Sequence, residues 1–297
     1  MGILTPVKVP VKVYRWDDVG APVLKRETDS LIDIFKACLV TGYGTKQGAG
    51  WTMPFEASGI KVFRPKPSPD TDFYLRCSGN TRVQMTAQIY VNMTDINTGD
   101  LKLQCASPFK YLRGAISGKW VLIASPRGFW FFNEQTDDYV TSVMENCGAY
   151  FFAGDVYSQN KSNVYMQHTG GDNDGAYSSL LRTFAYTFVE PDEESVYTQG
   201  VLLQDDGSVL TTDAYSIAGW DGTEKTLDNF VLAPIIINTA TDLFVLPGIF
   251  TSADGVTKQN FDEVSAASSV ALTSTIVFGT GTTSSSNFYI STDYWVH

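Results

Sequence analysis

Residues 83–91 read VQMTAQIYV, and this stretch decides the fold class. Apolar side chains occupy every second position from Val83 to Val91, and glutamine, threonine and tyrosine stand between them. Because successive side chains of a strand point to opposite faces, this alternation predicts a β-strand with one buried face and one solvated face. Strands of this kind are typical of antiparallel sheets that pack on a core through one side.

Patterns rich in β-branched and aromatic residues predict further strands along most of the chain. The predicted strands lie at residues 7–13, 101–105, 120–124, 129–133, 149–153, 182–189, 201–204, 209–211, 230–237, 244–246, 275–278 and 287–290. The turn sequences NTGD at 97–100 and DDGS at 205–208 predict hairpins between the strands that flank them. Proline lacks the N–H that a ladder hydrogen bond needs, so Pro10 places the first strand at a sheet edge. For the same reason Pro234 predicts a bulge or an edge.

One helix is predicted at about residues 29–40. Thr28 or Asp29 is expected to cap its start, and Gly42 is expected to end it in the left-handed conformation. Helical spacing places an apolar stripe on one side, formed by Leu31, Ile34, Phe35, Cys38 and Leu39. We therefore predict a mainly β protein, with antiparallel sheets in a sandwich- or barrel-like domain and this amphipathic helix packed on a sheet.

The length of 297 residues allows one large β domain or two smaller ones. Predicted strands continue on both sides of the acidic run PDEE at 191–194, so we interpret that run as a solvated loop. We therefore predict one continuous domain over residues 1–297, with a possible sub-boundary near 190–195.

The charge is unevenly spread over a chain whose net charge is −11. Residues 1–150 carry 17 Lys and Arg against 14 Asp and Glu, a balance of +3, whereas residues 151–297 carry 4 against 18, a balance of −14. An acidic half repels phosphate, so no nucleic-acid partner is expected. No stretch approaches the ~18 apolar residues of a membrane helix, and residues 1–13 lack the pattern of a secretory signal. We expect a protein made in a cytosol with no membrane partner.

Residue types that usually carry chemistry are scarce or poorly spaced. Only two histidines occur, and His168 lies in a stretch rich in turn residues, which predicts a loop histidine. The glycines from Gly42 to Gly48 follow a predicted helix and lack the spacing of a dinucleotide loop, so they are interpreted as tight-turn glycines. The cysteines show no C-x-x-C spacing and are interpreted as small buried side chains; they are Cys38, Cys77, Cys105 and Cys147. We predict no catalytic residue, no cofactor-binding residue and no metal ligand, and a chain that is not an enzyme.

Residues 264–292 contain no charged residue, although two predicted strands lie among them. An uncharged strand edge in water invites pairing with another strand. We therefore expect part of this region to be covered, either by the domain itself or by a partner. The candidate interface residues are Ile276, Val277, Phe278, Phe288, Tyr289 and Ile290.

Several segments resemble virion structural proteins of tailed bacteriophages. The N-terminal run VKVYRWDDVGAPVL at 11–24 and the run TGYGTKQGAGWTMPF at 41–55 carry most of the resemblance. Shorter matches follow at FYLR 73–76, SPRGFWFF 125–132, LPGI 246–249 and DYW 293–295. The resemblance implies a structural subunit located in the virion, most naturally in its tail, neck or baseplate, with other virion proteins and copies of itself as partners. It carries no functional residues over to this chain.

Other roles in a virion stay open at this point. One is decoration of the capsid surface, and another is binding of a host receptor or carbohydrate, in which exposed aromatic rings stack on sugars. The candidate stacking residues are Trp51, Trp130 and Trp220, each of which has a core position as its alternative. A depolymerase-type enzyme is a third reading, and it would require two carboxylates that face each other across a cleft.

Overall fold

The computed structural model describes a β protein built on two sheets that share a core. Described are residues 8–67, 72–104, 108–112, 117–134, 149–157, 162–168, 181–183, 200–203, 209–212, 214–216, 232–238, 243–252, 261, 263–264, 275–278 and 288–296. The predicted fold class is confirmed: the sheets are mainly antiparallel, and a short helix packs between them. The possible sub-boundary near 190–195 lies outside the described residues.

The smaller sheet has six strands in the order β4-β5-β6-β7-β8, with β9 paired to β7, and all neighbours are antiparallel. Its strands are β4 (Thr52–Ala57), β5 (Ile60–Arg64), β6 (Tyr74–Thr81), β7 (Gln84–Asp95), β8 (Thr98–Gln104) and β9 (Phe109–Lys110). Residues 84–91 of the opening stretch fall in β7, where Met85, Ala87 and Ile89 are buried as predicted. The predicted hairpin forms, but its turn lies at Ile96 and Asn97, because β7 extends to Asp95.

The larger sheet has 14 strands: eight follow the path β15-β18-β19-β20-β13-β12-β11-β2, and the other six pair off this path. Its first half consists of β2 (Lys12–Arg15), β11 (Trp120–Ala124), β12 (Gly128–Asn133), β13 (Ala149–Tyr157), β14 (Ser162–His168), β15 (Leu181–Thr183) and β16 (Gly200–Leu203). Its second half consists of β17 (Val209–Thr212), β18 (Ala214–Ser216), β19 (Leu232–Asn238), β20 (Leu243–Ser252), β21 (Glu263–Val264), β22 (Thr275–Phe278) and β23 (Phe288–Ser291).

Proline positions agree with the sequence predictions. β2 ends the path of the larger sheet, and β1 (Lys8–Pro10) pairs only with β24 (Tyr294–Val296) among the described strands. The register of β19 against β20 shifts between Pro234 and Ile236, which is the predicted bulge. A further two-stranded pair joins β3 (Leu24–Lys25) to β10 (Ser117–Gly118).

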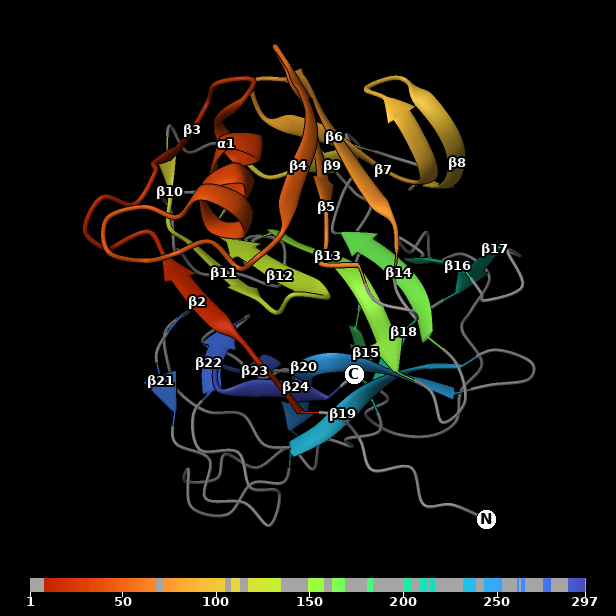
Figure 1. The fold of residues 1–297 in the computed structure, drawn as a ribbon. Helices are drawn as coiled ribbons and strands as arrows, with labels where there is room; N and C mark the ends of the chain where they lie inside the picture. Colours follow the sequence, from red (N-terminus) through yellow and green to blue (C-terminus); the bar gives the residue numbers. More distant parts are fainter. Residues whose placement is uncertain are drawn as a thin grey trace.

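Strands β11, β12 and β13 form a wall between two hydrophobic cores. Side chains on one side of the wall, such as Phe129 and Phe131, pack with the six-stranded sheet in the first core. Their neighbours Trp130 and Phe132 face a second core, which strands β19, β20, β22, β23 and β24 close from the far side. Figure 1 shows this layering, with β4–β8 above the wall and β19–β24 below it. A wall buried on both sides explains why its strands are apolar at nearly every position.

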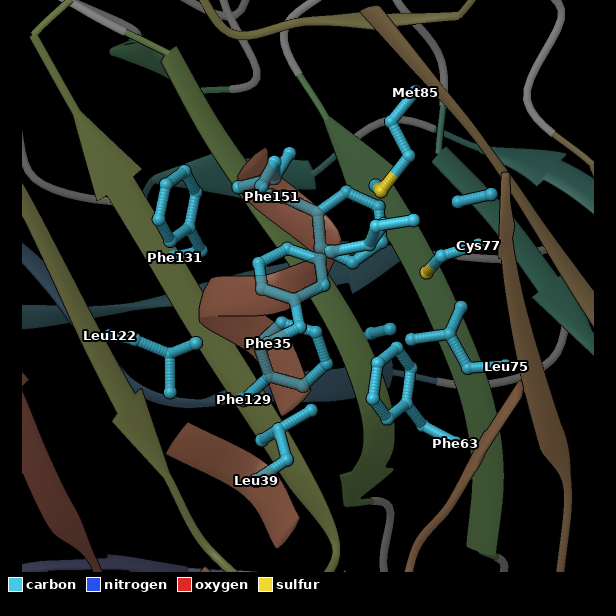
Figure 2. Packing of buried hydrophobic residues seen from close by; sticks show 14 of the residues in the cluster. Phe35, Leu39, Phe63, Leu75, Cys77, Met85, Leu122, Phe129, Phe131 and Phe151 are labelled. Carbon is cyan, nitrogen blue, oxygen red and sulfur yellow. The ribbon is translucent and has the colours of Figure 1, made fainter. Parts of the chain in front are cut away.

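The helix begins as α1 (Ser30–Lys36) and continues as one π-helical turn, η1 (Ala37–Thr41). Its predicted apolar stripe is buried in full, and Phe35 lies at the centre of the first core. The Phe35 ring centroid lies 5.0 Å from that of Phe129, 5.4 Å from Phe131 and 5.7 Å from Phe151 (Figure 2). Aromatic pairs at these spacings add about 0.5–1.5 kcal/mol each beyond their buried area. The helix therefore joins the two sheets through one ring cluster.

The ends of the helix differ from the prediction. Asp29 occupies the N-cap position without a capping side-chain hydrogen bond, and the hydroxyl of Ser30 accepts a bond from the backbone N–H of Lys25 and donates one to the carbonyl oxygen of Val23. Gly42 has a positive φ of 78°, but its ψ of 175° is extended rather than left-handed helical. The chain turns straight into a loop there, and a Cβ on Gly42 would stand 2.2 Å from the carbonyl oxygen of Lys46.

Candidate interaction surface

The side of the six-stranded sheet that faces away from the first core carries an ordered set of polar and aromatic side chains. In β6 and β7, the residues that alternate with the buried Leu75, Cys77, Ala87 and Ile89 point away from the first core. We call this side the outer face, and define it by Arg64, Tyr74, Arg76, Gln88, Tyr90 and Gln104. Tyrosine and arginine are among the residue types that are enriched at protein contacts. The outer face is therefore the candidate interaction surface.

A hydrogen-bond ladder crosses three strands of the outer face. Arg76 pairs with Gln88 across β6 and β7, and Gln88 pairs with Gln104 across β7 and β8. Nη1 of Arg76 donates to Oε1 of Gln88 at 3.0 Å, and Nε2 of Gln88 donates to Oε1 of Gln104 at 2.8 Å. Long side chains that are fixed before binding lose less rotamer entropy when a partner arrives.

Arg76 also holds the tip of the β7–β8 hairpin. Its Nε donates to the carbonyl oxygen of Ile96 at 3.0 Å, and its Nη2 donates to Oδ1 of Asn97 at 3.1 Å. The carboxylate of Asp95 is engaged instead by the backbone N–H of Asn97 at 2.7 Å, which together with Thr98 lowers the pKa of Asp95. Arg76 is thus held by three neutral acceptors, and no carboxylate pairs with it within the described residues.

The neighbouring arginine is neutralised locally. Arg64 donates from Nε and Nη2 to both oxygens of Asp72, at 2.8 and 2.7 Å. Its guanidinium lies 4.8 Å from the centroid of the Tyr74 ring, and Tyr74 stands opposite Tyr90 in the next strand. Hydrogen bonding to Asp72 raises the pKa of Arg64. This corner of the outer face therefore presents two tyrosines beside a closed ion pair.

A second polar cluster fixes the loop that follows the helix. Oδ2 of Asp18 accepts hydrogen bonds from the Tyr43 hydroxyl at 2.7 Å, from Nζ of Lys46 at 2.6 Å and from the backbone N–H of Arg15 at 2.8 Å. Burial raises the pKa of Asp18, but the bonds from Lys46, Tyr43 and Arg15 outweigh it and lower that pKa below its usual value. Lys46 also donates to the carbonyl oxygen of Val13 at 2.9 Å. These bonds tie the glycine-rich loop to β2, which agrees with its interpretation as a turn.

Residues considered for chemistry lie largely in the cores. His168 was predicted in a loop, but it ends β14 and is buried, with its ring stacked on Phe151 at 6.1 Å. That loop prediction is wrong, because the strand extends to His168 before the turn-rich sequence begins. Cys38 and Cys77 are buried as predicted, and burial raises the pKa of both thiols. Cys105 and Cys147 lie outside the described residues.

The tryptophans considered as sugar platforms are also core residues where they are described. Trp51 donates from Nε1 to the carbonyl oxygen of Ser125, and Trp130 donates to that of Pro247. Both are buried, so neither offers a ring face to a ligand. Trp220 lies outside the described residues. The rings of Tyr74 and Tyr90 are the aromatic surfaces that the outer face provides instead.

The candidate interface residues near the C-terminus lie on β22 and β23. Ile276, Tyr289 and Ile290 are buried within this chain, and Ile276 and Ile290 belong to the second core. The domain itself thus covers part of the uncharged region. The side chains of the remaining three lie outside the description; these are Val277, Phe278 and Phe288. That the six residues form an interface stays a prediction; Ile276, Tyr289 and Ile290 are paired with strands of this chain on both sides.

Sequence reasoning missed the outer face as a site. The alternation at 83–91 shows that Gln88 and Tyr90 share the solvated side of one strand. Their partners Arg76 and Tyr74 follow only from the register, because they lie in a different strand. A one-residue shift in the pairing of β6 with β7 would have placed Arg76 and Tyr74 on the core side.

Comparisons with known proteins add no relative. No family model matches the chain, no curated protein matches it, and no solved structure matches it. Within the part of the chain that the structure describes, no group of three or more His, Cys, Asp and Glu side chains is arranged to hold a metal ion. The same part contains no helix long and apolar enough to cross a membrane.

Proposed function

We propose that this chain is a structural subunit of a bacteriophage virion that assembles through protein–protein contacts, in the tail, neck or baseplate. The observation that carries the proposal is the outer face, where a ladder of bonds positions Arg76 and Gln88 beside two tyrosines. Pre-ordered arginine and tyrosine side chains contribute much of the energy of protein contacts. The resemblance at residues 11–24 and 41–55 supports the virion as the setting.

Two of the shorter segments that resemble those proteins belong to the framework of the fold. Residues 125–132 make the turn and strand in which the hydroxyl of Ser125 accepts bonds from the backbone N–H groups of Arg127 and Gly128. Residues 246–249 lie in β20 and receive the bond from Trp130. These two segments therefore serve the architecture, and the contact surface is argued from the outer face.

A carbohydrate- or receptor-binding module at the particle surface is the second candidate. Tyr74 and Tyr90 stand side by side with amide groups of Gln88 and Gln104, which is chemistry that also suits sugar rings. The structural role is preferred because two of the three tryptophans considered for stacking are buried.

The proposal is tested in purified phage particles that encode this chain. Quantitative mass spectrometry is expected to find it in every particle at a fixed copy number, and a stop codon early in its gene is expected to yield incomplete particles. A chain that is found in the lysate but is absent from washed particles contradicts the proposal. A glycan array probed with the purified protein distinguishes the carbohydrate-binding module from the structural subunit. Specific binding to a glycan that is abolished by Tyr90→Ala would favour the binding module.

A further inference from the structure

We propose that the tip of the β7–β8 hairpin, residues 93–99, is a lid that closes over part of the outer face and opens without unfolding the rest of the chain. Arg76 is its latch, Asn92 is its hinge, and Val62 is the side chain beneath it. The lid regulates the surface to which the proposed function assigns the contacts between chains, and it rests on that function only for this role.

The hairpin bends back over the sheet from which it comes. Gln88 stands directly opposite Arg76 in the register of β6 and β7, and Ile96 lies eight positions beyond Gln88. A straight strand of that length would carry Ile96 ~26 Å away, much further than an arginine side chain reaches. Nε of Arg76 nevertheless donates to the carbonyl oxygen of Ile96 at 3.0 Å. Because Arg76 points away from the first core, the lid lies over the outer face.

The bend is located at Asn92. This residue has a positive φ of 53° inside β7, a conformation that asparagine adopts more readily than most residues. The register of β7 against β8 shifts between Val91 and Asp95, and a bulge of this kind bends a strand. The lid therefore begins where β7 changes direction.

Val62 and Met93 are buried outside both cores. Val62 is 0% exposed and Met93 is 6% exposed, yet neither belongs to the first or the second core. Val62 stands opposite Arg76 in β5, and residues paired in this way share one side of a sheet. Met93 belongs to the lid, where a Cβ on Gly99 would stand 2.7 Å from its Cγ. A side chain on the outer face needs a cover to be this buried, and the lid supplies it.

Few bonds hold the lid closed. Arg76 donates to the carbonyl oxygen of Ile96 and to Oδ1 of Asn97, at 3.0 and 3.1 Å. The turn of the lid is closed by its own residues, since Asp95 pairs with Thr98 and its carboxylate accepts the N–H of Asn97. Five of the seven lid residues are exposed. Segments with so little buried surface open at low free energy while core strands stay folded.

Opening changes what the outer face offers to a partner. It exposes the apolar side chains of Val62 and Met93, and it releases two donor groups of Arg76. Closing hides this apolar surface in the isolated chain, where an exposed patch would favour nonspecific association. The outer face thus has a closed and an open form, and the latch sets their ratio.

Thiol labelling of the variant Val62→Cys measures the opening. Cys77 is the internal control, because it lies in the neighbouring strand but faces the first core. Peptide mass spectrometry reads the label at each position. The introduced thiol is expected to react at least ~100-fold faster than Cys77, since local opening costs less than global unfolding. Its rate should depend weakly on urea, whereas the rate of Cys77 should rise steeply.

The latch is tested in the Val62→Cys background. Arg76→Met removes the bonds to the lid, and Arg82→Met makes the same change in charge at an exposed position outside the outer face. Arg76→Met is expected to raise the labelling rate at position 62 at least ~10-fold, because it deletes charged hydrogen bonds. Arg82→Met should change this rate less than about 2-fold.

The hinge is tested by two substitutions at one position. Asn92→Val introduces a β-branched side chain, which disfavours a positive φ, and should raise the labelling rate at position 62. Asn92→Gly, which adopts a positive φ freely, should not raise it. Equal rates in the two variants would show that the bend lies elsewhere.

Three outcomes would overturn the proposal. They are labelling at position 62 as slow as at Cys77, labelling as fast as in the urea-unfolded chain, and equal effects of Arg76→Met and Arg82→Met. Should a variant fail to fold by circular dichroism, Met93→Cys replaces Val62→Cys, and Arg76→Lys, which keeps the charge but loses the forked donor geometry, replaces Arg76→Met. None of these results changes whether the chain is found in washed particles, so failure of the lid and failure of the proposed function are distinguishable.

Discussion

Nε1 of Trp130 donates a hydrogen bond of 2.9 Å to the carbonyl oxygen of Pro247, which lies 117 positions further along the chain. The bond crosses the second core, from the wall strand β12 to the closing strand β20. The rest of the indole packs against Phe152, with ring centroids 4.6 Å apart. One side chain thus links the segments 125–132 and 246–249, and it serves the architecture rather than a ligand.

Replacing Trp130 by Phe removes this bond and leaves the buried carbonyl of Pro247 without its donor. We expect the free energy of unfolding to fall by about 1–3 kcal/mol, the usual cost of an unsatisfied buried polar group. Urea unfolding followed by circular dichroism measures the change. Val19→Ala, at a side chain that is 91% exposed, serves as the control and should stay within about 0.5 kcal/mol of wild type. Equal stability of the Trp130 variant and wild type would show that the bond contributes nothing.

Removing one partner of the ion pair between Arg127 and Asp155 is predicted to destabilise the protein more than removing both. Asp155 is almost fully buried, and its backbone N–H also donates to the carbonyl oxygen of Arg127 at 3.2 Å. Asp155→Leu leaves the partly buried guanidinium of Arg127 without its carboxylate and should cost about 1–3 kcal/mol. The double variant Arg127→Met with Asp155→Leu should recover part of that loss, as measured by chemical unfolding. A double variant less stable than the single one contradicts the account.

Asp18 is predicted to make stability depend on pH in the acidic range. Hydrogen bonds from Lys46, Tyr43 and Arg15 lower its pKa in the folded state, although burial acts in the opposite direction. Its contribution is therefore fully present above the unfolded pKa of about 3.9, and is lost as pH falls through the lower folded value. Asp18→Asn should thus be less stable than wild type at pH 7, and the gap should close toward pH 2. A gap that stays constant with pH would refute this assignment.

Ile290 is predicted to be required for folding rather than for contacts between chains. It pairs with Ile249 and Ile276 in neighbouring strands, and all three belong to the second core. Ile290→Ala should lower stability by about 2–5 kcal/mol, because it opens a cavity there. Val209→Ala, at a position 45% exposed, is the matched control. Removing residues 264–292 should accordingly destabilise the isolated protein, which thermal unfolding can establish.

The sequence predicted the position of single strands better than it predicted which strands lie next to one another. Alternation and composition located β7, β11, β12 and β22 within a few residues, since those patterns reflect burial of one strand at a time. Pairings between distant segments carry no such local signal. The outer face depends on the register that sets Arg76 against Gln88, and the second core depends on β19–β24 closing over the wall. His168 was misplaced because β14 continues up to it, although residues typical of turns follow it in the sequence.

Hydroxyl-radical footprinting of Tyr74 and Tyr90 tests the central claim most directly. Both side chains are partly exposed in the isolated chain, so their oxidation can be followed by mass spectrometry. We predict that both are oxidised in the purified protein and become protected in assembled particles, while exposed residues such as Val19 keep their reactivity. Equal oxidation of the two tyrosines in free and assembled protein would contradict assembly through the outer face.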